Sequence, residues 1–208
     1  MKKIAILLFI TSSFVFAQNT YVPDDKFEQA LIDLGYDTTL DDSVLTANIS
    51  GVTTLDVSEK EISDLTGIEA FTALTVLKIY NNKLTSLNVS ANTALTTLDF
   101  CANQLTSMDL SKNTALTKLT SCDNKLASLD VSKNTVLTWL HIKNNQLTYL
   151  NMRNGVTDGL TTFDATENPN LTCIEVLDPA WSTENWTSAK ENIDAGVTFT
   201  YICGVDVD

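Results

Sequence analysis

Two cysteines and the one histidine of the sequence are the side chains best suited to chemistry at related positions. Cys101, Cys122 and His141 follow one another along the chain at nearly equal intervals. Two thiolates and an imidazole are ligands that zinc and copper accept, so Cys101, Cys122 and His141 form a candidate metal site. The alternative, which we favour, is a pair of surface cysteines beside an isolated histidine.

Catalysis has little support in the sequence. A Cys–His nucleophile needs an orienting third group and an oxyanion hole, and a flat parallel sheet supplies neither. Asp109 and Asp130 are 21 residues apart and are expected to lie side by side at equivalent positions of neighbouring repeats, with Lys112 and Lys133 nearby. This explains the two carboxylates better than a weak calcium site does. Phosphate loops and metal-hydrolase motifs are absent. We therefore predict that the protein is not an enzyme and has no cofactor.

These residues lie in a repeat with a 21-residue period. Units begin at Leu74, Leu95, Leu116 and Leu137, with a fifth copy from Leu160 and a 22-residue variant from Val52. The first, fourth and sixth residues of a unit are apolar, as in Leu95, Leu98 and Phe100, and are predicted to stack inside a solenoid. The ninth residue is an asparagine whose amide can couple successive units; these are Asn82, Asn103, Asn124, Asn145 and Asn168.

The back half of each unit repeats the same formula, so that leucines recur in alternating 10- and 11-residue steps. This spacing leaves no room, and no 3.6-residue pattern, for a helix on the convex side. We predict extended chain there, with a second asparagine ladder formed by Asn92, Asn113 and Asn134. The expected fold is a β-rich, right-handed solenoid with a parallel sheet on its concave face.

The spacing resembles LxxLxLxxNxL, the signature of leucine-rich repeats, over roughly 52–172, and the nested halves resemble the class called IRREKO. The strings VPDDKFEQALIDLGYD, NTALT and NPNLTCIEV are similar to those of secreted leucine-rich repeat proteins of flavobacteria and related Bacteroidota. The resemblance covers nearly the whole chain after Ala17. It implies an exported repeat protein.

Both ends of the repeats are predicted to be capped. A short helix begins after Asp24 or Asp25 and stops at Gly35. Its apolar face comprises Phe27, Ala30, Leu31 and Leu34. The segment 64–73 is expected to add one helical turn, and Trp181 and Trp186 supply bulk over the last repeat. The expected domains are a signal peptide at 1–17, a helical cap at 18–51, repeats at 52–172 and a C-terminal cap at 173–208.

The segment 1–17 resembles a secretory signal peptide. A basic Met1–Lys3 start precedes an apolar segment too short to anchor a protein in a bilayer, and Val15 and Ala17 supply small residues before the cut. The formal charge of −13 excludes nucleic acid and anionic membranes as partners. We expect an exported protein, either secreted, on the cell surface or periplasmic, with no membrane segment in the mature chain. Two capped ends favour a monomer.

Four cysteines in an exported protein favour disulfides. A bond between Cys173 and Cys203 would pin the C-terminal cap to the repeats and stabilise it by roughly 3 kcal/mol. Cys101 and Cys122 are expected on neighbouring strands about 4.8 Å apart, within disulfide range, but parallel side-chain directions fit the bond poorly. Their redox state stays open.

The residues that point out of the concave sheet form the candidate binding patch, which comprises Trp139, His141, Lys143, Tyr80, Lys78 and Lys118. Aromatic side chains on a rigid sheet bind partners at low entropic cost. The alternative is that Trp139 folds over its neighbours for packing. We predict an interaction module that binds a protein or peptide through this face. The alternative functions are a carbohydrate-binding or adhesive surface protein and the metal site above.

Overall fold

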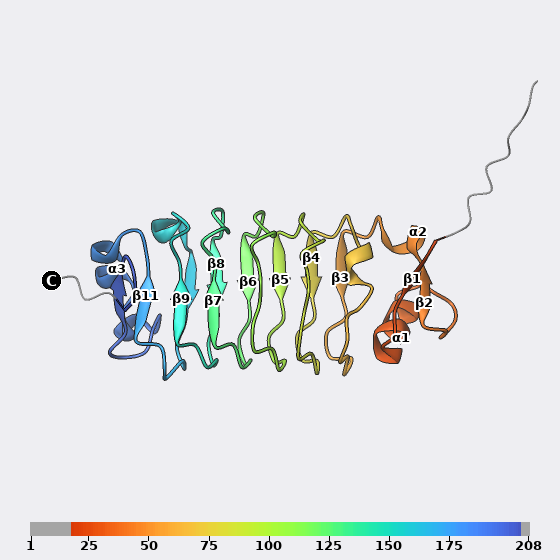
Figure 1. Cartoon of the computed structure of the whole chain (residues 1–208), viewed down its shortest axis with the longest axis horizontal. Helices are drawn as coiled ribbons and strands as arrows, with labels where there is room; N and C mark the ends of the chain where they lie inside the picture. The colour runs from red at the N-terminus through yellow and green to blue at the C-terminus, as the bar shows by residue number, and fades with distance from the viewer. Residues whose placement is uncertain (1–17, 205–208) are drawn as a thin grey trace, which may run out of the picture.

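Two parallel sheets run along the two sides of an elongated solenoid (Figure 1). The computed structural model describes residues 18–204, and the predicted signal peptide at 1–17 lies outside them. The front sheet contains β3 (Thr54–Asp56), β4 (Val76–Lys78), β5 (Thr97–Asp99), β6 (Lys118–Thr120), β8 (Trp139–His141) and β10 (Thr162–Asp164). The back sheet contains β7 (Ser128–Asp130), β9 (Tyr149–Asn151), β11 (Cys173–Glu175) and β12 (Thr198–Thr200). One turn of the solenoid is called a rung below.

The core is a stack of leucines between the two sheets. The central residues of the six front strands are in register: Leu55, Leu77, Leu98, Leu119, Leu140 and Phe163. All six are buried, because alternate residues of a strand point to opposite faces. The predicted inward positions and the β-rich solenoid are therefore confirmed.

The back of the solenoid is extended, as the 10- and 11-residue steps predict. Among the described residues, helical segments lie in the two end regions and in short turns of the repeats that begin at Val52 and Leu137. These are α1 (Asp25–Asp33), α2 (Thr46–Ile49), η1 (Ile68–Ala70), η2 (Thr157–Gly159), α3 (Pro179–Asn185) and η3 (Ser188–Lys190). The turn η1 is the one predicted within 64–73.

Both asparagine ladders form. On the front ladder, the buried amide of Asn124 donates to Phe100 O, Ser121 O and Cys122 O at 3.0, 3.4 and 3.1 Å, while its Oδ1 accepts from Leu105 N at 3.0 Å. On the back ladder, Asn113 donates to the carbonyl oxygens of the preceding rung, Val89 and Asn92, both at 3.0 Å. The structural interpretation of these asparagines is confirmed.

A third ladder was not predicted. At the second position of each unit a threonine hydroxyl donates to the backbone oxygen of the equivalent threonine one rung earlier, at 2.9 to 3.2 Å. The donors are Thr75, Thr96, Thr117, Thr138 and Thr161. Neighbouring rungs are thus joined by three ladders, two of asparagine and one of threonine side chains.

Three residues after each front strand, the backbone adopts a left-handed conformation that the sequence does not predict. The eighth position of each unit has a left-handed φ of 52 to 59°, although none of these residues is glycine. They are Glu59, Asn81, Ala102, Asp123, Asn144 and Glu167. Such conformations cost about 1 kcal/mol or more for a residue with a Cβ, so the stacked ladders must impose them.

The N-terminal region packs against the first rung. β1 (Asn19–Tyr21) pairs antiparallel with β2 (Ser43–Leu45), and Phe27 of α1 lies 6.4 Å from Phe71 between ring centroids. Asp24 is the N-cap, and Gly35 turns the chain with a φ of 79°. The expectation that Leu34 joins the buried face is wrong, because the helix ends at Asp33 and Leu34 is an exposed C-cap.

Asp24 joins this helix to the repeats. Its Oδ1 accepts from the backbone N–H groups of Lys26 and Phe27, and its Oδ2 accepts from Ser63 N, Ser63 Oγ and Asp64 N at 2.7 to 2.9 Å. Partial burial raises the pKa of Asp24, but the hydrogen bonds from Ser63, Phe27 and Asp64 outweigh burial and hold the pKa below its usual value.

Asp24→Ala is expected to lower the free energy of unfolding by about 2 kcal/mol at pH 7, the upper range for loss of an N-cap. Because the folded-state pKa is depressed, this contribution is fully present above the unfolded pKa near 3.8 and is lost as the pH falls through the folded value. Urea unfolding at several pH values measures both effects. Asp25→Ala, at the exposed neighbouring position, is the control; an equal loss in that variant would contradict the assignment.

The C-terminal rung is closed by aromatic side chains and a disulfide. Trp186 is buried and lies 4.5 Å from Phe163, 5.5 Å from Trp181 and 5.8 Å from Phe199 between ring centroids. Cys173 and Cys203 form a disulfide with a Cα separation of 5.9 Å, as the sequence predicts. The aromatic cluster and the disulfide therefore cover the apolar end of the last rung.

Candidate functional site

The front face, meaning the side chains that point outward from the front strands, carries the predicted patch. Lys118, Trp139 and His141 lie on the paired strands β6 and β8, and Lys143 follows β8 directly. Lys78 and Tyr80 lie on and just after β4, which β5 and β6 separate from β8. The structure thus brings four of the six residues together and leaves the other two apart from them.

Trp139 is packed as well as partly exposed. The Lys118 ammonium lies 4.5 Å from the centroid of its ring, within the range of a cation–π interaction. The indole Nε1 is shielded from solvent and has no hydrogen-bond partner among the described residues. Trp139 therefore combines the two roles that the sequence offered as alternatives: it covers its neighbours and still presents part of its ring.

Three of the four basic residues of the patch are paired with acids on adjoining rungs. Lys78 Nζ lies 3.6 Å from Asp56, His141 Nε2 lies 3.4 Å from Asp164, and Lys143 Nζ lies 3.0 Å from Glu167. The Glu167 carboxylate raises the pKa of Lys143 through its hydrogen bond and its charge. The predicted aromatic and basic patch is thus closer to neutral than the sequence suggested.

Sequence reasoning missed these acidic partners, although signals for two of them were present. Aligning the units places Asp164 opposite His141 and Asp56 opposite Lys78, because each of these residues is fifth in its unit. A further acid, Asp99 of β5, faces Lys78 and Thr120 in the same register. Burial raises the pKa of Asp99, and a hydrogen bond from Cys101 N together with nearby lysines only partly offsets this.

Cys101 and Cys122 form a disulfide, with a Cα separation of 4.6 Å. The sequence left their redox state open, and in this structure neighbouring rungs bring the two sulfur atoms into a bond. Because the two sulfur atoms are bonded to each other, they offer no thiolates to a metal beside His141. The candidate metal site at Cys101, Cys122 and His141 is therefore not formed.

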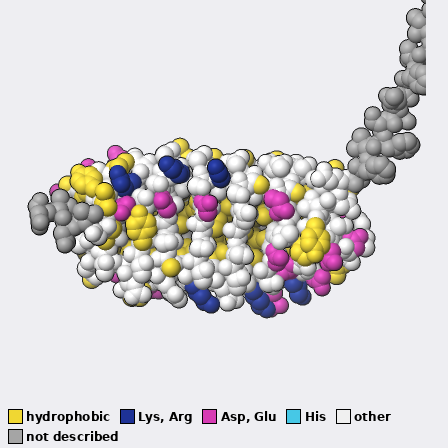
Figure 2. Space-filling model, viewed as in Figure 1, with side chains coloured by type: hydrophobic (Ala, Val, Ile, Leu, Met, Phe, Trp, Pro, Cys, Tyr) yellow, Lys and Arg dark blue, Asp and Glu magenta, His cyan; other side chains and the backbone are white. Residues whose placement is uncertain are grey.

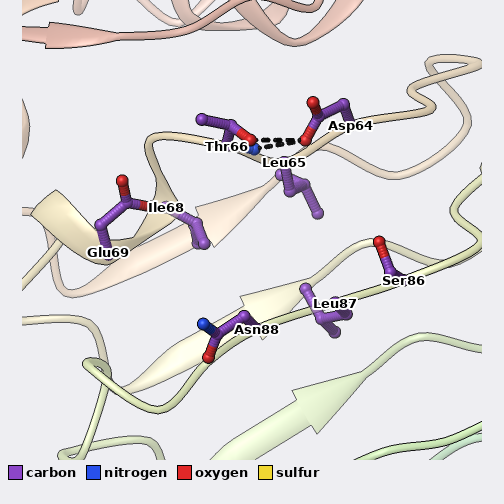
Figure 3. A pocket seen from close by; sticks show the side chains of 8 residues that line it. All are labelled: Asp64, Leu65, Thr66, Ile68, Glu69, Ser86, Leu87 and Asn88. Carbon is purple, nitrogen blue, oxygen red and sulfur yellow. Dashed lines mark hydrogen bonds between the residues drawn. The ribbon is translucent and has the colours of Figure 1, made fainter.

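The back of the first repeats is hollowed. Figure 2 shows apolar side chains along a recessed strip of one long face, and acidic side chains gathered toward the end that holds α1. A cleft of about 510 Å³ lies between the segments 64–69 and 86–88, and Leu65, Ile68 and Leu87 extend between these segments (Figure 3). None of the predicted site residues lines it.

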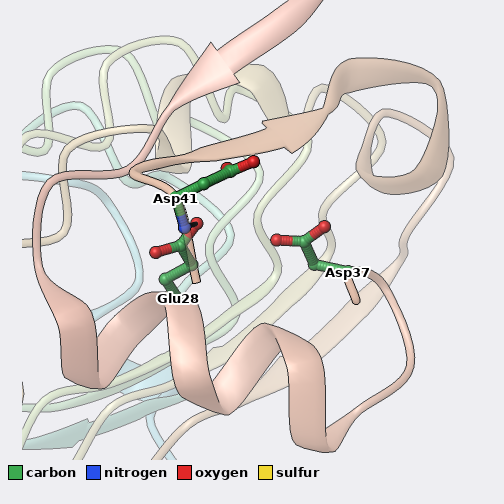
Figure 4. Close-up of side chains that lie close together, drawn as sticks. All are labelled: Glu28, Asp37 and Asp41. Atoms are coloured by element: carbon green, nitrogen blue, oxygen red, sulfur yellow. Dashed lines mark hydrogen bonds between the residues drawn. The ribbon is translucent and has the colours of Figure 1, made fainter. Parts of the chain in front are cut away.

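Three carboxyl groups meet beside α1. Oxygen atoms of Glu28, Asp37 and Asp41 lie within 4.8 Å of one another (Figure 4). Glu28 is fully buried, and its two oxygens accept the backbone N–H groups of Asp41, Asp42 and Ser43 at 2.9 to 3.1 Å. These amides supply partners for the Glu28 carboxylate, whereas Asp37 Oδ2 is shielded from solvent and has no hydrogen-bond partner among the described residues.

Among residues 18–204, no helix is long and apolar enough to cross a membrane. No protein-family profile matches the chain, and no curated protein matches it in sequence.

Several solved structures match in fold. The functional domain of InlJ from Listeria monocytogenes, which includes a cysteine ladder, superposes with a TM-score of 0.66 and 31% identity over 79% of this chain and 39% of that one. An internalin, InlF, from the same organism gives a TM-score of 0.51 and 16% identity over 86% and 68%. A leucine-rich repeat protein of Leptospira interrogans gives 0.51 and 20% over 71% and 38%. The chain spans about two fifths of the InlJ structure.

Proposed function

Because the chain folds as a leucine-rich repeat protein, we propose that it is an exported, non-enzymatic interaction module that binds a protein or peptide through its front face. Solenoids of this kind use the extended surfaces of their stacked repeats for binding. Two disulfides fit an extracellular protein. A flavobacterial type of repeat protein, a signal peptide at 1–17 and a monomeric state remain parts of this proposal.

The observation that carries the proposal is the contrast between front-face and ladder positions. Ladder and core positions hold the same residue type on successive rungs, as Asn103, Asn124 and Asn145 do. Outward positions of the front strands change from rung to rung instead, from Thr97 and Asp99 to Lys118 and Thr120, and then to Trp139 and His141. Stacking requires repetition, whereas recognition of one partner requires a particular arrangement of different side chains.

The size of the front face limits the partner. Six strands about 4.8 Å apart, each presenting about 13 Å of chain, give roughly 400 Å². A standard interface uses about 800 Å² on each side. The face by itself therefore suits a peptide or a protruding loop. Since Lys78 and Lys143 are paired with acids, the partner need not carry a large opposite charge.

Capture of binding partners tests the proposal. Mature protein is used to pull down proteins from the membrane and secreted fractions of its source cells, beside a Trp139→Ala/His141→Ala variant and a back-face control, Lys112→Ala/Lys133→Ala. A genuine partner is expected to bind the double front-face variant at least about tenfold more weakly, since central aromatic contacts dominate interfaces. Equal affinity of the parent and this variant for a confirmed partner would place the binding site elsewhere.

A carbohydrate ligand is the second candidate. Tyr80 and Trp139 are both partly exposed on the same sheet, where aromatic rings could stack on sugars. They lie three rungs, about 14 Å, apart, so a linear glycan would have to span both. A glycan array distinguishes the two functions: hits above background that disappear with Trp139→Ala would favour carbohydrate, and an array without hits would exclude this candidate.

A further inference from the structure

The two disulfides of the chain lie in different surroundings. The Cys101–Cys122 disulfide joins adjacent rungs at the seventh position of their units, directly after β5 and β6. Cys101 is largely buried, whereas Cys122 is partly exposed. Tyr80 precedes this pair in the same row and Lys143 follows it, so the disulfide lies within the front face.

The rungs that this disulfide joins are also held by other bonds. Phe100 N donates to Thr120 O at 3.0 Å, and Ala102 N donates to Cys122 O at 2.9 Å. The Asn124 side chain of the second rung donates to Phe100 O and accepts from Leu105 N of the first rung, both at 3.0 Å. Opening the S–S bond therefore leaves the stacking of β5 on β6 in place, and the bond is not needed to position the strands.

Cys101 Sγ is the sulfur atom of this pair that leaves more readily as a thiolate. The backbone N–H of Cys122 donates to Cys101 Sγ at 2.9 Å. A hydrogen-bond donor stabilises a thiolate, and a better stabilised thiolate is a better leaving group in thiol–disulfide exchange. Since Cys122 is the more exposed residue of the pair, its Sγ is the one that we expect an incoming thiol to reach, and Cys101 Sγ is the one released.

A nearby positive charge also favours the approach of a thiolate to Cys122. In the row of seventh positions, Cys122 lies between Cys101 and Lys143. An incoming thiolate must attack Cys122 Sγ from the side opposite Cys101, and Lys143 lies on that side. Its ammonium is held 3.0 Å from Glu167 of the next rung. At each disulfide a cysteine N–H donates to a carboxylate, Cys101 N to Asp99 and Cys203 N to Glu175, so this contact does not distinguish the two bonds.

We infer that the Cys101–Cys122 disulfide is a thiol-exchange site at which Cys122 takes up a thiol-bearing ligand. A thiolate in solution forms a bond to Cys122 Sγ, the Cys122–Cys101 bond breaks, and its electron pair leaves with Cys101 Sγ as a thiolate. The products are a mixed disulfide on Cys122 and a reduced Cys101, so no oxidant is needed. The ligand then sits on the front face between Cys101 and Lys143.

The native protein tests this inference because it contains its own control disulfide. Folded mature protein is treated with 2-mercaptoethanol or reduced glutathione, trapped with iodoacetamide at timed intervals, and mapped by peptide mass spectrometry, with circular dichroism recorded in parallel. We expect the Cys101–Cys122 bond to open at least about tenfold faster than Cys173–Cys203, with the adduct on Cys122, alkylation on Cys101 and an unchanged spectrum. A cysteine-containing peptide used in place of glutathione shows whether a protein thiol is also accepted.

Either of two results would overturn the inference: Cys173–Cys203 opening as fast as Cys101–Cys122, or adducts mapping to Cys101 rather than Cys122. Cys101→Ser provides an independent check, because it leaves Cys122 as a free thiol with the neighbouring rung bonds intact. This variant is expected to form a mixed disulfide with oxidised glutathione while keeping the wild-type spectrum. Absence of this adduct in the folded variant would show that Cys122 is not reachable.

Discussion

Asn124→Ala is expected to lower the free energy of unfolding by about 3 to 4 kcal/mol. The side chain donates to three carbonyl oxygens and accepts from Leu105 N, and it is buried at the bend between β6 and β7. Alanine removes all four of these hydrogen bonds and leaves Leu105 N without its acceptor, whereas the three carbonyl oxygens keep their bonds from Asn103, Asn145 and Ala102 N. Each buried hydrogen bond that is lost costs about 1 kcal/mol.

Urea unfolding followed by circular dichroism measures this loss. Gln104→Ala is the matched control, since Gln104 is an exposed amide on the preceding rung whose side chain bonds only Lys125 at the surface. We expect a change below about 0.5 kcal/mol for the control. A similar small change for Asn124→Ala would mean that the ladder amides are replaced by water without cost. Hydrogen exchange is expected to speed up at Leu105 N and on the neighbouring rungs.

Glu28→Ala is expected to cost about 3 kcal/mol, because it removes the one side chain that binds three successive backbone N–H groups. These belong to Asp41, Asp42 and Ser43, and they hold a turn in which Asp42 has a left-handed φ of 62°. The turn leads into β2, whose pairing with β1 completes the N-terminal region. Loss of Glu28 therefore loosens the turn and the sheet together.

Thermal and urea unfolding test this prediction, with Gln29→Ala as the control at the exposed neighbouring position of the same helix. Glu28→Gln, which keeps the shape and one acceptor oxygen, is expected to fall between the wild type and Glu28→Ala. If Glu28→Gln were as stable as the wild type, the charge of Glu28 would contribute nothing to the turn. If Glu28→Ala were as stable as Gln29→Ala, the three hydrogen bonds would be dispensable.

The sequence predicted the features that recur with the repeat. A residue such as Leu98 or Asn124 has equivalents on several rungs, and stacking on an equivalent leaves one arrangement that buries every leucine and pairs every amide. The solenoid, both asparagine ladders and the extended back follow from this periodicity. The N-terminal helix was predicted from its own local signals, with Asp24 as one of two candidate caps.

The features that were missed depend on pairs of different residues. The contacts of His141 and Lys143 with acids involve a fifth copy shifted by a two-residue insertion, and Glu28 meets its amides across a turn that no repeat specifies. The left-handed residues, such as Ala102 and Glu167, carry no local signal because they are not glycine. The Cys101–Cys122 bond depends on side-chain directions that spacing does not determine.

The ladders also have a consequence for how such a protein changes its size. The Asn, Thr and leucine contacts described here connect a rung only to its neighbours, so a duplicated 21-residue segment would meet the same partners on both sides that its parent does. Length is thus separable from the chemistry of the two ends. A gene duplication within the repeats would move the front-face side chains relative to the N-terminal helix in steps of one strand, and would create a new binding surface from existing parts.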